Sequence, residues 1–395
     1  VDKNKKLIFN QFRKIDNVLN KKFLLDFQYI FVADKKFKDA SYLPKNHKEK
    51  YSILNSYISS RDRILIMLQF IFYSFKFFFI KKKIISKLDK INDYIFKIFS
   101  DDYNNSFFGN VLIENLIWIR VFENYLSKTN KKKYGLYLIE NQPWEKAMIT
   151  AWKNHNHGKI IGYTPTSINY WHLYNFDISK RNYACPSKIF ISSKIGFKFL
   201  KDQYLKKKIG IFKVESLWFN YLVEKKIKLN IIKNKKCILV LGDYNSEVNH
   251  KLIKIINKSK IKTKYKIFFK PHPNDLNNYN LKNIKFKKKT NTYFFKNANL
   301  IISAGSTAAI LEYLFFQKKV FVYDDPGMLD LSPIKHLNYQ FKFKSVKDFN
   351  KLINLKMKVK LITKGFKNYY FLDRDLNKWK SFFKICKNKN KYSEL

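Results

Sequence analysis

The sequence predicts an α/β fold made of two successive, doubly wound domains. From residue 134 onward, short apolar runs of strand length alternate with helical patterns, which implies parallel βαβ units. The alternation stops at the charged stretch Glu224–Lys236 and then starts again, and 46% of the 395 residues are apolar, enough for a core in each half. We therefore expect domains at 1–223 and 237–365, a linker at 224–236, and a helical tail at 366–395 that packs back on the first domain.

The first domain is expected to begin with a basic, mostly helical part that contains one strand, Phe23–Ile30. An alternating region follows it. Apolar runs there predict strands at Tyr134–Ile139, Lys159–Tyr163 and Lys188–Ser192. The helical spacing of apolar residues predicts helices at Leu112–Leu126, Pro143–Asn154 and Lys194–Tyr204.

The second domain repeats this alternation. Its apolar runs predict strands at Cys237–Leu241, Tyr265–Phe269, Leu300–Ile302 and Lys319–Tyr323. Helices are expected at Ser246–Lys258 and Ser306–Phe316, and in the tail at Asp375–Cys386. Because strands alternate with helices, we expect a parallel sheet whose strands have their carboxyl ends at one edge, where ligands of such sheets bind.

The formal net charge of +49 indicates anionic partners: nucleic acid, acidic lipid or phosphorylated substrates. The lysines are spread along the chain, and no RNP-type, zinc-finger or helix-turn-helix signature is present, so no nucleic-acid partner is expected. Cys185, Cys237 and Cys386 are far apart and lack CxxC spacing. This favours buried thiols in a reducing cytoplasm over a metal site or disulfides.

The segment Ile64–Ile80 (ILIMLQFIFYSFKFFFI) is strongly apolar and has cationic flanks. Three interpretations stay open: a buried helix of the first domain, which we favour, an interfacial anchor on acidic lipid, and a membrane span. The chain opens on an amphipathic stretch without the apolar core of a signal peptide. We expect a cytoplasmic protein, with peripheral contact to the acidic inner face of the membrane as an option.

His272 stands between Pro271 and Pro273, directly after a predicted strand. Two prolines fix the backbone around it, which presents the imidazole from a stiff loop at the carboxyl edge of the sheet. We expect His272 to donate a hydrogen bond to a phosphate or a nucleotide ribose, with Lys270 and Asn274 assisting. The loop that opens with Gly242 and Asp243 is expected at the same edge.

A second signal is Leu300–Leu311 (LIISAGSTAAIL), in which a strand ends at Ser303 and a helix follows. Gly305 permits a tight turn and the close approach of a ligand. Ser306 or Thr307 is expected to cap the helix, whose free N–H groups would then form an anion site. Taken alone, an ordinary helix cap remains an alternative.

Together, these motifs resemble the C-terminal domain of GT-B glycosyltransferases that build bacterial surface polysaccharides, of the sialyl-, polysialyl- and Kdo-transferase-like families. The matching residues are His272-Pro273, and Ser303 with Ser306-Thr307. The resemblance implies a GT-B-like fold, two Rossmann-like doubly wound domains facing a cleft. It also implies that the histidine binds the nucleotide of a CMP-sugar and that the serine and threonine bind its phosphate. Glu312 resembles the acidic residue that many GT-B enzymes place near the donor ribose.

The N-terminal half is similar to surface-carbohydrate biosynthesis proteins of the same group over Tyr137–Ala147 (YLIENQPWEKA) and Ile160–Trp171 (IIGYTPTSINYW). Pro143 opens a helix there at a favoured position. Polar residues near these two strand ends are expected on the acceptor side of the site. They are Asn141, Gln142, Thr164, Thr166 and Ser167.

The expected function is transfer of a sugar, with a CMP-activated ulosonic acid such as sialic acid or Kdo suggested by the resemblance, to a glycan or lipid-linked acceptor of capsule or lipopolysaccharide type. Glu140, before Glu145 or Asp177, would act as general base. For Glu145, stabilisation of the helix dipole is the favoured alternative. No metal is expected, and the reaction would be inverting. The acidic pair in VYDDPG is interpreted as a turn: Asp324 and Asp325.

Three alternative functions stay open. The first is a nucleotide-sugar epimerase or hydrolase of the same fold, the second a non-catalytic partner in polysaccharide assembly, and the third a basic nucleic-acid-binding protein. Turnover of a nucleotide-sugar without acceptor would favour the first, absence of nucleotide-sugar binding the second, and salt-sensitive RNA binding the third.

Overall fold

A computed structural model describes much of the chain. The described residues are 15, 27–29, 51–88, 93–164, 184–224, 237–263, 265–272, 275, 277, 279, 284–286, 294, 297–335, 339–355 and 369–389. The chain divides into two compact units. The first comprises residues 1–164, 179–190 and 205–212, and the second comprises 165–178, 191–204 and 213–395. Most of the predicted linker, residues 225–236, lies outside the described residues.

The sheet of the first unit has the strand order β3-β4-β5-β6. These strands are β3 (Tyr134–Leu138), β4 (Lys159–Thr164), β5 (Lys188–Ile191) and β6 (Gly210–Lys213). β3 and β4 are parallel, in the register Leu138 opposite Tyr163, and the helix α5 (Pro143–Asn154) connects them. A separate parallel pair is formed by β1 (Phe27–Tyr29) and β2 (Tyr51–Ile53), and a 3-10 turn, η2 (Leu54–Tyr57), follows it.

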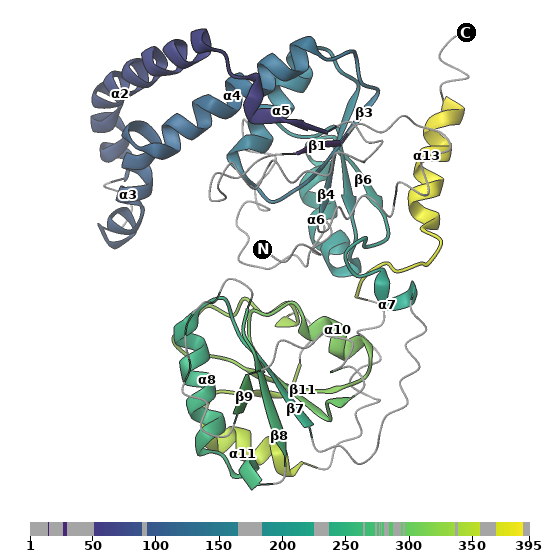
Figure 1. The fold of residues 1–395 in the computed structure, drawn as a ribbon. Helices are drawn as coiled ribbons and strands as arrows, with labels where there is room; N and C mark the ends of the chain where they lie inside the picture. Colours follow the sequence, from purple (N-terminus) through teal and green to yellow (C-terminus); the bar gives the residue numbers. More distant parts are fainter. Residues whose placement is uncertain are drawn as a thin grey trace. The chain divides into compact units, whose positions relative to one another are not determined.

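Three helices precede this sheet: α2 (Ser60–Leu88), α3 (Asp93–Phe108) and α4 (Asn110–Lys128). Figure 1 shows α4 beside α5, with α2 and α3 further from the sheet. The buried face of α4 packs on α5 and η2 through a cluster that includes Val121, Phe122 and Trp152. The prediction of a basic helical part before the sheet is therefore confirmed for the described residues.

The preferred interpretation of Ile64–Ile80 as a buried helix is wrong. The helix α2 forms there as predicted, but most of its large apolar side chains are exposed. Within the described part of the chain, Ser60–Ile80 is the one stretch whose length and composition would allow it to cross a membrane, and only 11% of its 18-residue window is buried. Its neighbours α3 and α4 cover one face of α2 and leave the other to solvent.

The second unit contains a six-stranded sheet in the order β12-β11-β10-β7-β8-β9, with every neighbouring pair parallel. The strands are β7 (Cys237–Leu241), β8 (Lys266–Lys270), β9 (Ile284–Phe286), β10 (Leu300–Ala304), β11 (Lys319–Tyr323) and β12 (Lys342–Phe343). β8 and β9 follow β7 in sequence and extend the sheet on one side of it. β10 then pairs with the other side of β7, and β11 and β12 extend the sheet in that direction. The strand order thus reverses between β7 and β10, as in doubly wound nucleotide-binding sheets.

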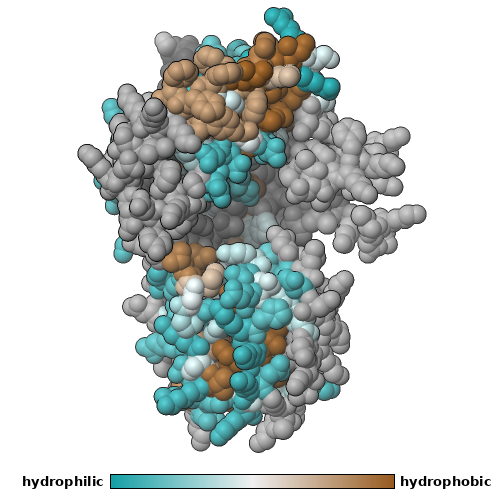
Figure 2. All heavy atoms as spheres, turned by 90° about the vertical axis from the view of Figure 1, so that its left-hand side faces the viewer, coloured by the Kyte–Doolittle hydropathy of each residue, from teal (hydrophilic) through white to brown (hydrophobic). Residues whose placement is uncertain are grey.

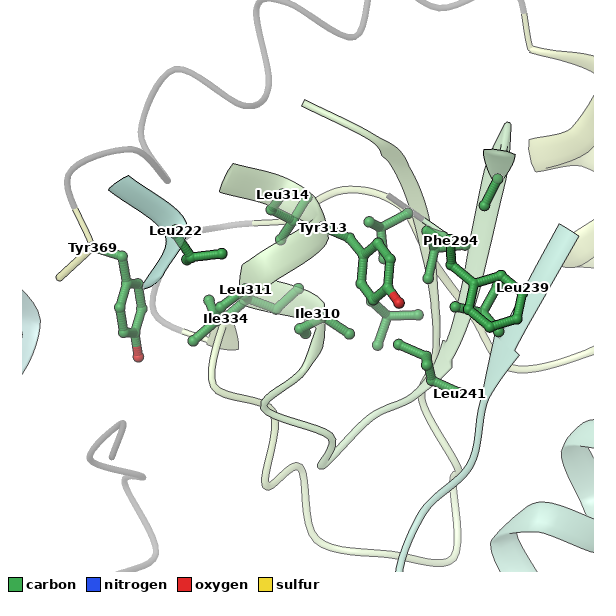
Figure 3. Close-up of a cluster of buried hydrophobic side chains, with 14 of the residues drawn as sticks. Leu222, Leu239, Leu241, Phe294, Ile310, Leu311, Tyr313, Leu314, Ile334 and Tyr369 are labelled. Atoms are coloured by element: carbon green, nitrogen blue, oxygen red, sulfur yellow. The ribbon is translucent and has the colours of Figure 1, made fainter. Parts of the chain in front are cut away.

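Helices cover both faces of this sheet, because alternate residues of a buried strand point to opposite sides. Leu239 and Leu241 of β7 join a cluster with α10 (Ile310–Phe315), and Figure 3 shows these side chains together. On the other face, Ile238 and Val240 pack with α8 (Ser246–Lys258) and α11 (Val346–Asn354). The predicted α/β class with parallel strands is confirmed.

The last described helix, α13 (Asn377–Lys389), is held by a buried carboxylate. Glu215 accepts hydrogen bonds from the backbone N–H groups of Lys378 (2.8 Å) and Trp379 (3.2 Å), and the Trp379 indole donates to the Glu215 carbonyl at 2.9 Å. Tyr370 forms an antiparallel bridge with Ser193, just before α6 (Lys194–Leu205). These contacts fall inside the second unit.

Candidate functional site

The loops that follow β7 and β10 meet where the strand order reverses. The Ser306 hydroxyl donates a hydrogen bond to the Asp243 carboxylate, and the Thr307 hydroxyl donates to the Gly242 carbonyl at 2.8 Å. Gly242 also donates its N–H to the Lys270 carbonyl at 2.9 Å, which ties in the end of β8. The structure therefore brings together five of the predicted donor-side residues at one edge of the sheet.

Two glycines allow the backbone to come this close. A Cβ atom at Gly242 would lie 3.0 Å from both the Asn249 Oδ1 atom and the Phe269 ring. A Cβ at Gly305 would lie 3.1 Å from the Tyr323 carbonyl oxygen at the end of β11. Larger residues at either position would push the neighbouring loops apart.

The predicted helix at Ser306–Phe316 begins later than expected. α10 starts at Ile310, and its N-cap is Ala309, which makes no side-chain cap. The hydroxyls of Ser306 and Thr307 donate to the β7 loop, and neither accepts a hydrogen bond as the cap of α10. The prediction that Ser306 or Thr307 caps this helix is therefore wrong.

A buried asparagine that the sequence reasoning missed holds the β7 loop in place. Asn249 of α8 is fully buried; its Oδ1 accepts from the Asp243 N–H (2.6 Å), and its Nδ2 donates to the Asp243 carbonyl (2.8 Å) and to Asp275 (2.7 Å). The detectable signal was an amide on the otherwise apolar face that Val248 and Leu252 mark. A buried polar group of this kind must find partners inside the protein.

Asp275 extends the same network to the histidine loop. Its N–H donates to the His272 carbonyl at 3.0 Å, and its carboxylate accepts from Asn249 and from the Tyr279 hydroxyl. Burial acts to raise the pKa of Asp275, but the hydrogen bonds from Tyr279, Asn277 and Asn249 outweigh it and hold that pKa below its usual range. Burial and the bond to Asp275 raise the pKa of Tyr279 to about 12.

His272 lies at the predicted edge, directly after β8. Its ring centroid is 6.4 Å from that of Tyr244, in an edge-on arrangement, and Tyr244 belongs to the loop after β7. The imidazole is half-buried, while Tyr244 is 54% exposed, so a ligand could reach both rings. The other predicted members of this loop, Pro273 and Asn274, lie outside the described residues.

The partly buried Lys270 amine feels the charge of the buried Glu312 carboxylate. Burial lowers the pKa of Lys270, and the negative charge of Glu312 partly restores it. Glu312 is buried on α10 and accepts a hydrogen bond from the Tyr221 hydroxyl of α7 (Tyr221–Glu224); burial first, and then this carboxylate, raise the pKa of Tyr221. The Glu312 carboxylate thus acts to raise the pKa of both Lys270 and Tyr221, which belong to the same unit.

A pocket that is open to solvent lies beside the reversal point. It extends from the loops after β7 and β10 to the segment after β11. Its polar lining residues include Asp243, Tyr244, Ser306, Asp324, Asp325 and Asp330. Ser303, also predicted to bind donor, lies inside β10 instead, where its hydroxyl donates to the Ala304 carbonyl at 2.8 Å.

The acidic residues of this pocket are balanced by lysines. Nζ–carboxylate distances are 3.2 Å for Lys251 and Asp325, 2.9 Å for Lys342 and Asp330, and 3.8 Å for Lys344 and Asp324. Asp325 also accepts the Gly327 N–H at 3.0 Å, which gives the acidic pair the turn role that its sequence predicts. Among the described residues, no group of three His, Cys, Asp or Glu side chains is placed to hold a metal ion.

In the first unit, Glu140 and Thr164 lie at the same edge of the sheet. β3 and β4 are parallel, and the Ile139 N–H donates to the Tyr163 carbonyl at 2.8 Å. The Glu140 side chain is exposed, whereas Thr164 is buried and its hydroxyl donates to the Phe190 carbonyl at 3.1 Å. The predicted residues Thr166, Ser167 and Asp177 lie outside the described residues.

Glu145 supports the turn between β3 and α5. One carboxylate oxygen accepts from the N–H groups of Glu140 (2.8 Å) and Gln142 (2.7 Å), and the side chain is 1% exposed. Burial raises the pKa of Glu145, although these two bonds oppose the shift. Between them, Asn141 takes a left-handed backbone (φ 60°), which asparagine tolerates better than most residues. This geometry agrees with the structural alternative for Glu145.

Comparisons with known proteins give no family for this chain. No family model matches it, and no curated protein matches it. Among solved structures, it is similar to CalG4, the calicheamicin glycosyltransferase, with 10% identity, a TM-score of 0.41, and coverage of 71% of this chain and 78% of that one. MurG from Acinetobacter baumannii gives 11% identity, a TM-score of 0.41, and coverage of 63% and 71%.

A third similar structure is the UDP-GlcNAc 2-epimerase from Methanocaldococcus jannaschii, with 12% identity, a TM-score of 0.45, and coverage of 71% and 83%. Similarities at this level of identity and TM-score assign neither an activity nor a substrate. The α/β class rests on the parallel strand pairings of the chain itself.

Proposed function

We propose that this chain is a GT-B-type glycosyltransferase whose second unit binds a nucleotide-sugar. The observation that carries the proposal is the meeting of the loops after β7, β8 and β10 where the strand order reverses. In open parallel sheets, nucleotides bind in the crevice at this point. The resemblance of the His272-Pro273 and Ser306-Thr307 motifs to surface-polysaccharide glycosyltransferases supports the same conclusion.

The side chains at the edge have the chemistry that a sugar nucleotide needs. His272 and Lys270 can donate hydrogen bonds to phosphate oxygens, and a bound phosphate would favour the charged form of the partly desolvated Lys270 amine. Carboxylates such as Asp243 can accept hydrogen bonds from ribose hydroxyls. We propose a CMP-activated ulosonic acid as the donor, because the order of the His-Pro and Ser-Thr motifs resembles that of enzymes using such donors.

Transfer would be a single displacement that inverts the anomeric centre. The acceptor oxygen attacks the anomeric carbon, the bond from that carbon to the nucleotide phosphate breaks, and the acceptor proton passes to a carboxylate. His272 and Lys270 would stabilise the negative charge on the departing phosphate without a metal. For the base we propose Glu140, because its side chain is exposed whereas Glu145 is bound to the main chain.

The acceptor is proposed to be an anionic surface glycan or its lipid-linked precursor. The net charge of +49 gives the chain a strong attraction for such a molecule and for an acidic membrane surface. This choice agrees with a place in the cytoplasm, at the inner face of the membrane.

The test is a thermal-shift screen of the full chain against CMP, CDP, UDP and GDP and their sugar conjugates. We expect one nucleotide and its conjugates to stabilise the wild-type protein selectively. His272→Ala should weaken that binding about 10- to 100-fold, as the loss of a charge-assisted hydrogen bond would. His155→Ala, a substitution in the first unit, should leave the affinity unchanged and is the matched control.

Two outcomes would overturn the proposal. Stabilisation by none of these ligands would leave the reversal point without a nucleotide and favour a non-catalytic protein. Turnover of the bound nucleotide-sugar at the same rate with and without any acceptor would instead favour an epimerase or a hydrolase.

A further inference from the structure

The helix α2 has two apolar faces, and only one of them is covered by the protein. At 100° per residue, eight exposed apolar side chains fall within about 140° of the helix circumference. They are Ile64, Met67, Leu68, Ile71, Phe72, Phe75, Phe78 and Phe79, and we call them the outer face. Figure 2 shows apolar atoms gathered over this part of the molecule. Exposure of such a contiguous face on a soluble protein marks an interaction site.

The opposite face fixes α2 to its own unit. Ile66 packs with Leu112 and Leu116 of α4, and the Ser74 hydroxyl donates to the Phe107 carbonyl of α3 at 3.0 Å. Phe77 is 1% exposed; its ring centroid lies 4.8 Å from that of Phe107 and 4.7 Å from that of Phe108. A helix that crossed a membrane would have to give up this packing, so the outer face can only be covered from the side.

The charges around the outer face select the partner. Asp62 is the only acidic residue of α2; it is buried and accepts hydrogen bonds from the Ser59 N–H and the Asn124 amide, both at 2.9 Å. Arg61, Arg63 and Lys76 are exposed, and the Lys76 Nζ lies 6.0 Å from the Phe72 ring centroid, at the rim of the outer face. An apolar, phenylalanine-rich face with a cationic border matches the interface of an acidic bilayer.

A second copy of the chain fits less well. Two copies would bring their cationic borders together, and each carries a net charge of +49. We propose that α2 lies in the plane of an acidic membrane surface, with its outer face among the acyl chains and Arg61, Arg63 and Lys76 at the lipid headgroups. This inference is independent of the glycosyl-transfer proposal, because it uses only the first unit.

The test is flotation of the full chain with vesicles of phosphatidylcholine, with or without phosphatidylglycerol. We expect binding to the anionic vesicles and a decrease of about tenfold or more in partitioning for F72S/F75S/F79S. These side chains are 60%, 64% and 82% exposed, so their replacement should not disturb folding. The matched control, L205S/Y265S/L355S, removes three exposed apolar side chains outside α2 and should bind like the wild type.

A charge variant, sedimentation and carbonate washing distinguish a bilayer interface from a second copy of the chain and from a membrane span. R61Q/R63Q/K76Q should lose about tenfold or more in partitioning to the anionic vesicles, because each cation near such a surface contributes to binding. Equal loss in the control triple variant, or no binding to either vesicle, would overturn the proposal. So would self-association in sedimentation that F72S/F75S/F79S abolishes without any lipid binding. Retention of the protein in native membranes after alkaline carbonate washing would indicate a span and also contradict it.

Discussion

The Ser306 hydroxyl donates a hydrogen bond to the Asp243 carboxylate, across the point where the strand order of the second unit reverses. This contact joins the loops after β7 and β10, and both residues line the pocket. The sequence suggests that Ser306 caps a helix. In the structure, its hydroxyl instead orients the Asp243 carboxylate.

A comparison of two serines tests this role. Ser306→Ala should weaken nucleotide binding about tenfold, because the Asp243 carboxylate loses the donor that orients it. Ser303→Ala is the matched control, since that hydroxyl is buried in β10 and bonded to the Ala304 carbonyl. Isothermal titration of both variants with the nucleotide found in the screen gives the answer. A larger loss of nucleotide affinity in Ser303→Ala would instead assign the binding role to Ser303 of β10.

Replacement of Asn249 should destabilise the protein strongly. Asn249→Ala leaves the Asp243 N–H without its acceptor and removes one of the donors to the Asp275 carboxylate, at a cost of about 2–4 kcal/mol in the free energy of unfolding. Asn245→Ala removes the cap of α8, a bond from the Glu247 N–H, and a weak contact with the Met328 sulfur, and should cost about 1 kcal/mol. Urea unfolding of the two variants distinguishes them. Equal losses would show that the buried amide contributes no more than a surface cap.

The two glutamates after β3 should separate chemistry from stability. Glu140→Gln should keep nucleotide affinity and lower turnover by about 100-fold, as the loss of a general base does. Glu145→Ala should lower the free energy of unfolding by about 1–3 kcal/mol, because two backbone N–H groups lose their acceptor. Steady-state kinetics and urea unfolding measure these effects. Unchanged turnover in Glu140→Gln would assign the base to another carboxylate, such as Asp177.

The Asp275 network should make the protein sensitive to acid. The pKa of Asp275 is lower in the folded chain than the value of about 3.9 for an unfolded aspartate. Its contribution to stability is therefore complete above about pH 4 and is lost as the pH falls through the folded value. Asp275→Asn should be less stable at pH 7 and should lose less stability on acidification.

Urea midpoints at pH 7 and at about pH 3 give the loss of stability on acidification for the wild type and for Asp275→Asn. Asp202→Asn changes an exposed carboxylate of α6 and serves as the control. If Asp275→Asn and the wild type lose the same stability on acidification, the low pKa does not contribute to folding.

The regular elements of both sheets could be predicted because their signals are local. Cys237–Leu241 and Lys319–Tyr323 are continuous apolar runs, and the structure has strands with those same bounds. The helix at Ser246–Lys258 was also predicted with its observed bounds, and Asn245 caps it. Such signals depend on a few neighbouring residues.

The details of the site depend on contacts between distant residues. Ser306 and Thr307 precede two alanines, a pattern typical of a helix start, but their partners lie 63 and 65 positions away. Asn249 reaches Asp275 over 26 positions. The sequence of α2 is apolar on both faces, so it could not show which face the protein covers. In each case the deciding interaction is tertiary.

The bond between Glu215 and the start of α13 has a consequence for synthesis of the chain. The Glu215 carboxylate and the Trp379 N–H are 164 positions apart. At about 5–20 residues per second, Glu215 is synthesised roughly 8 to 33 s before Trp379. During that interval the pocket for the Trp379 indole is empty and a carboxylate destined for burial stays hydrated. The second unit can therefore complete its fold only after Trp379 has been synthesised.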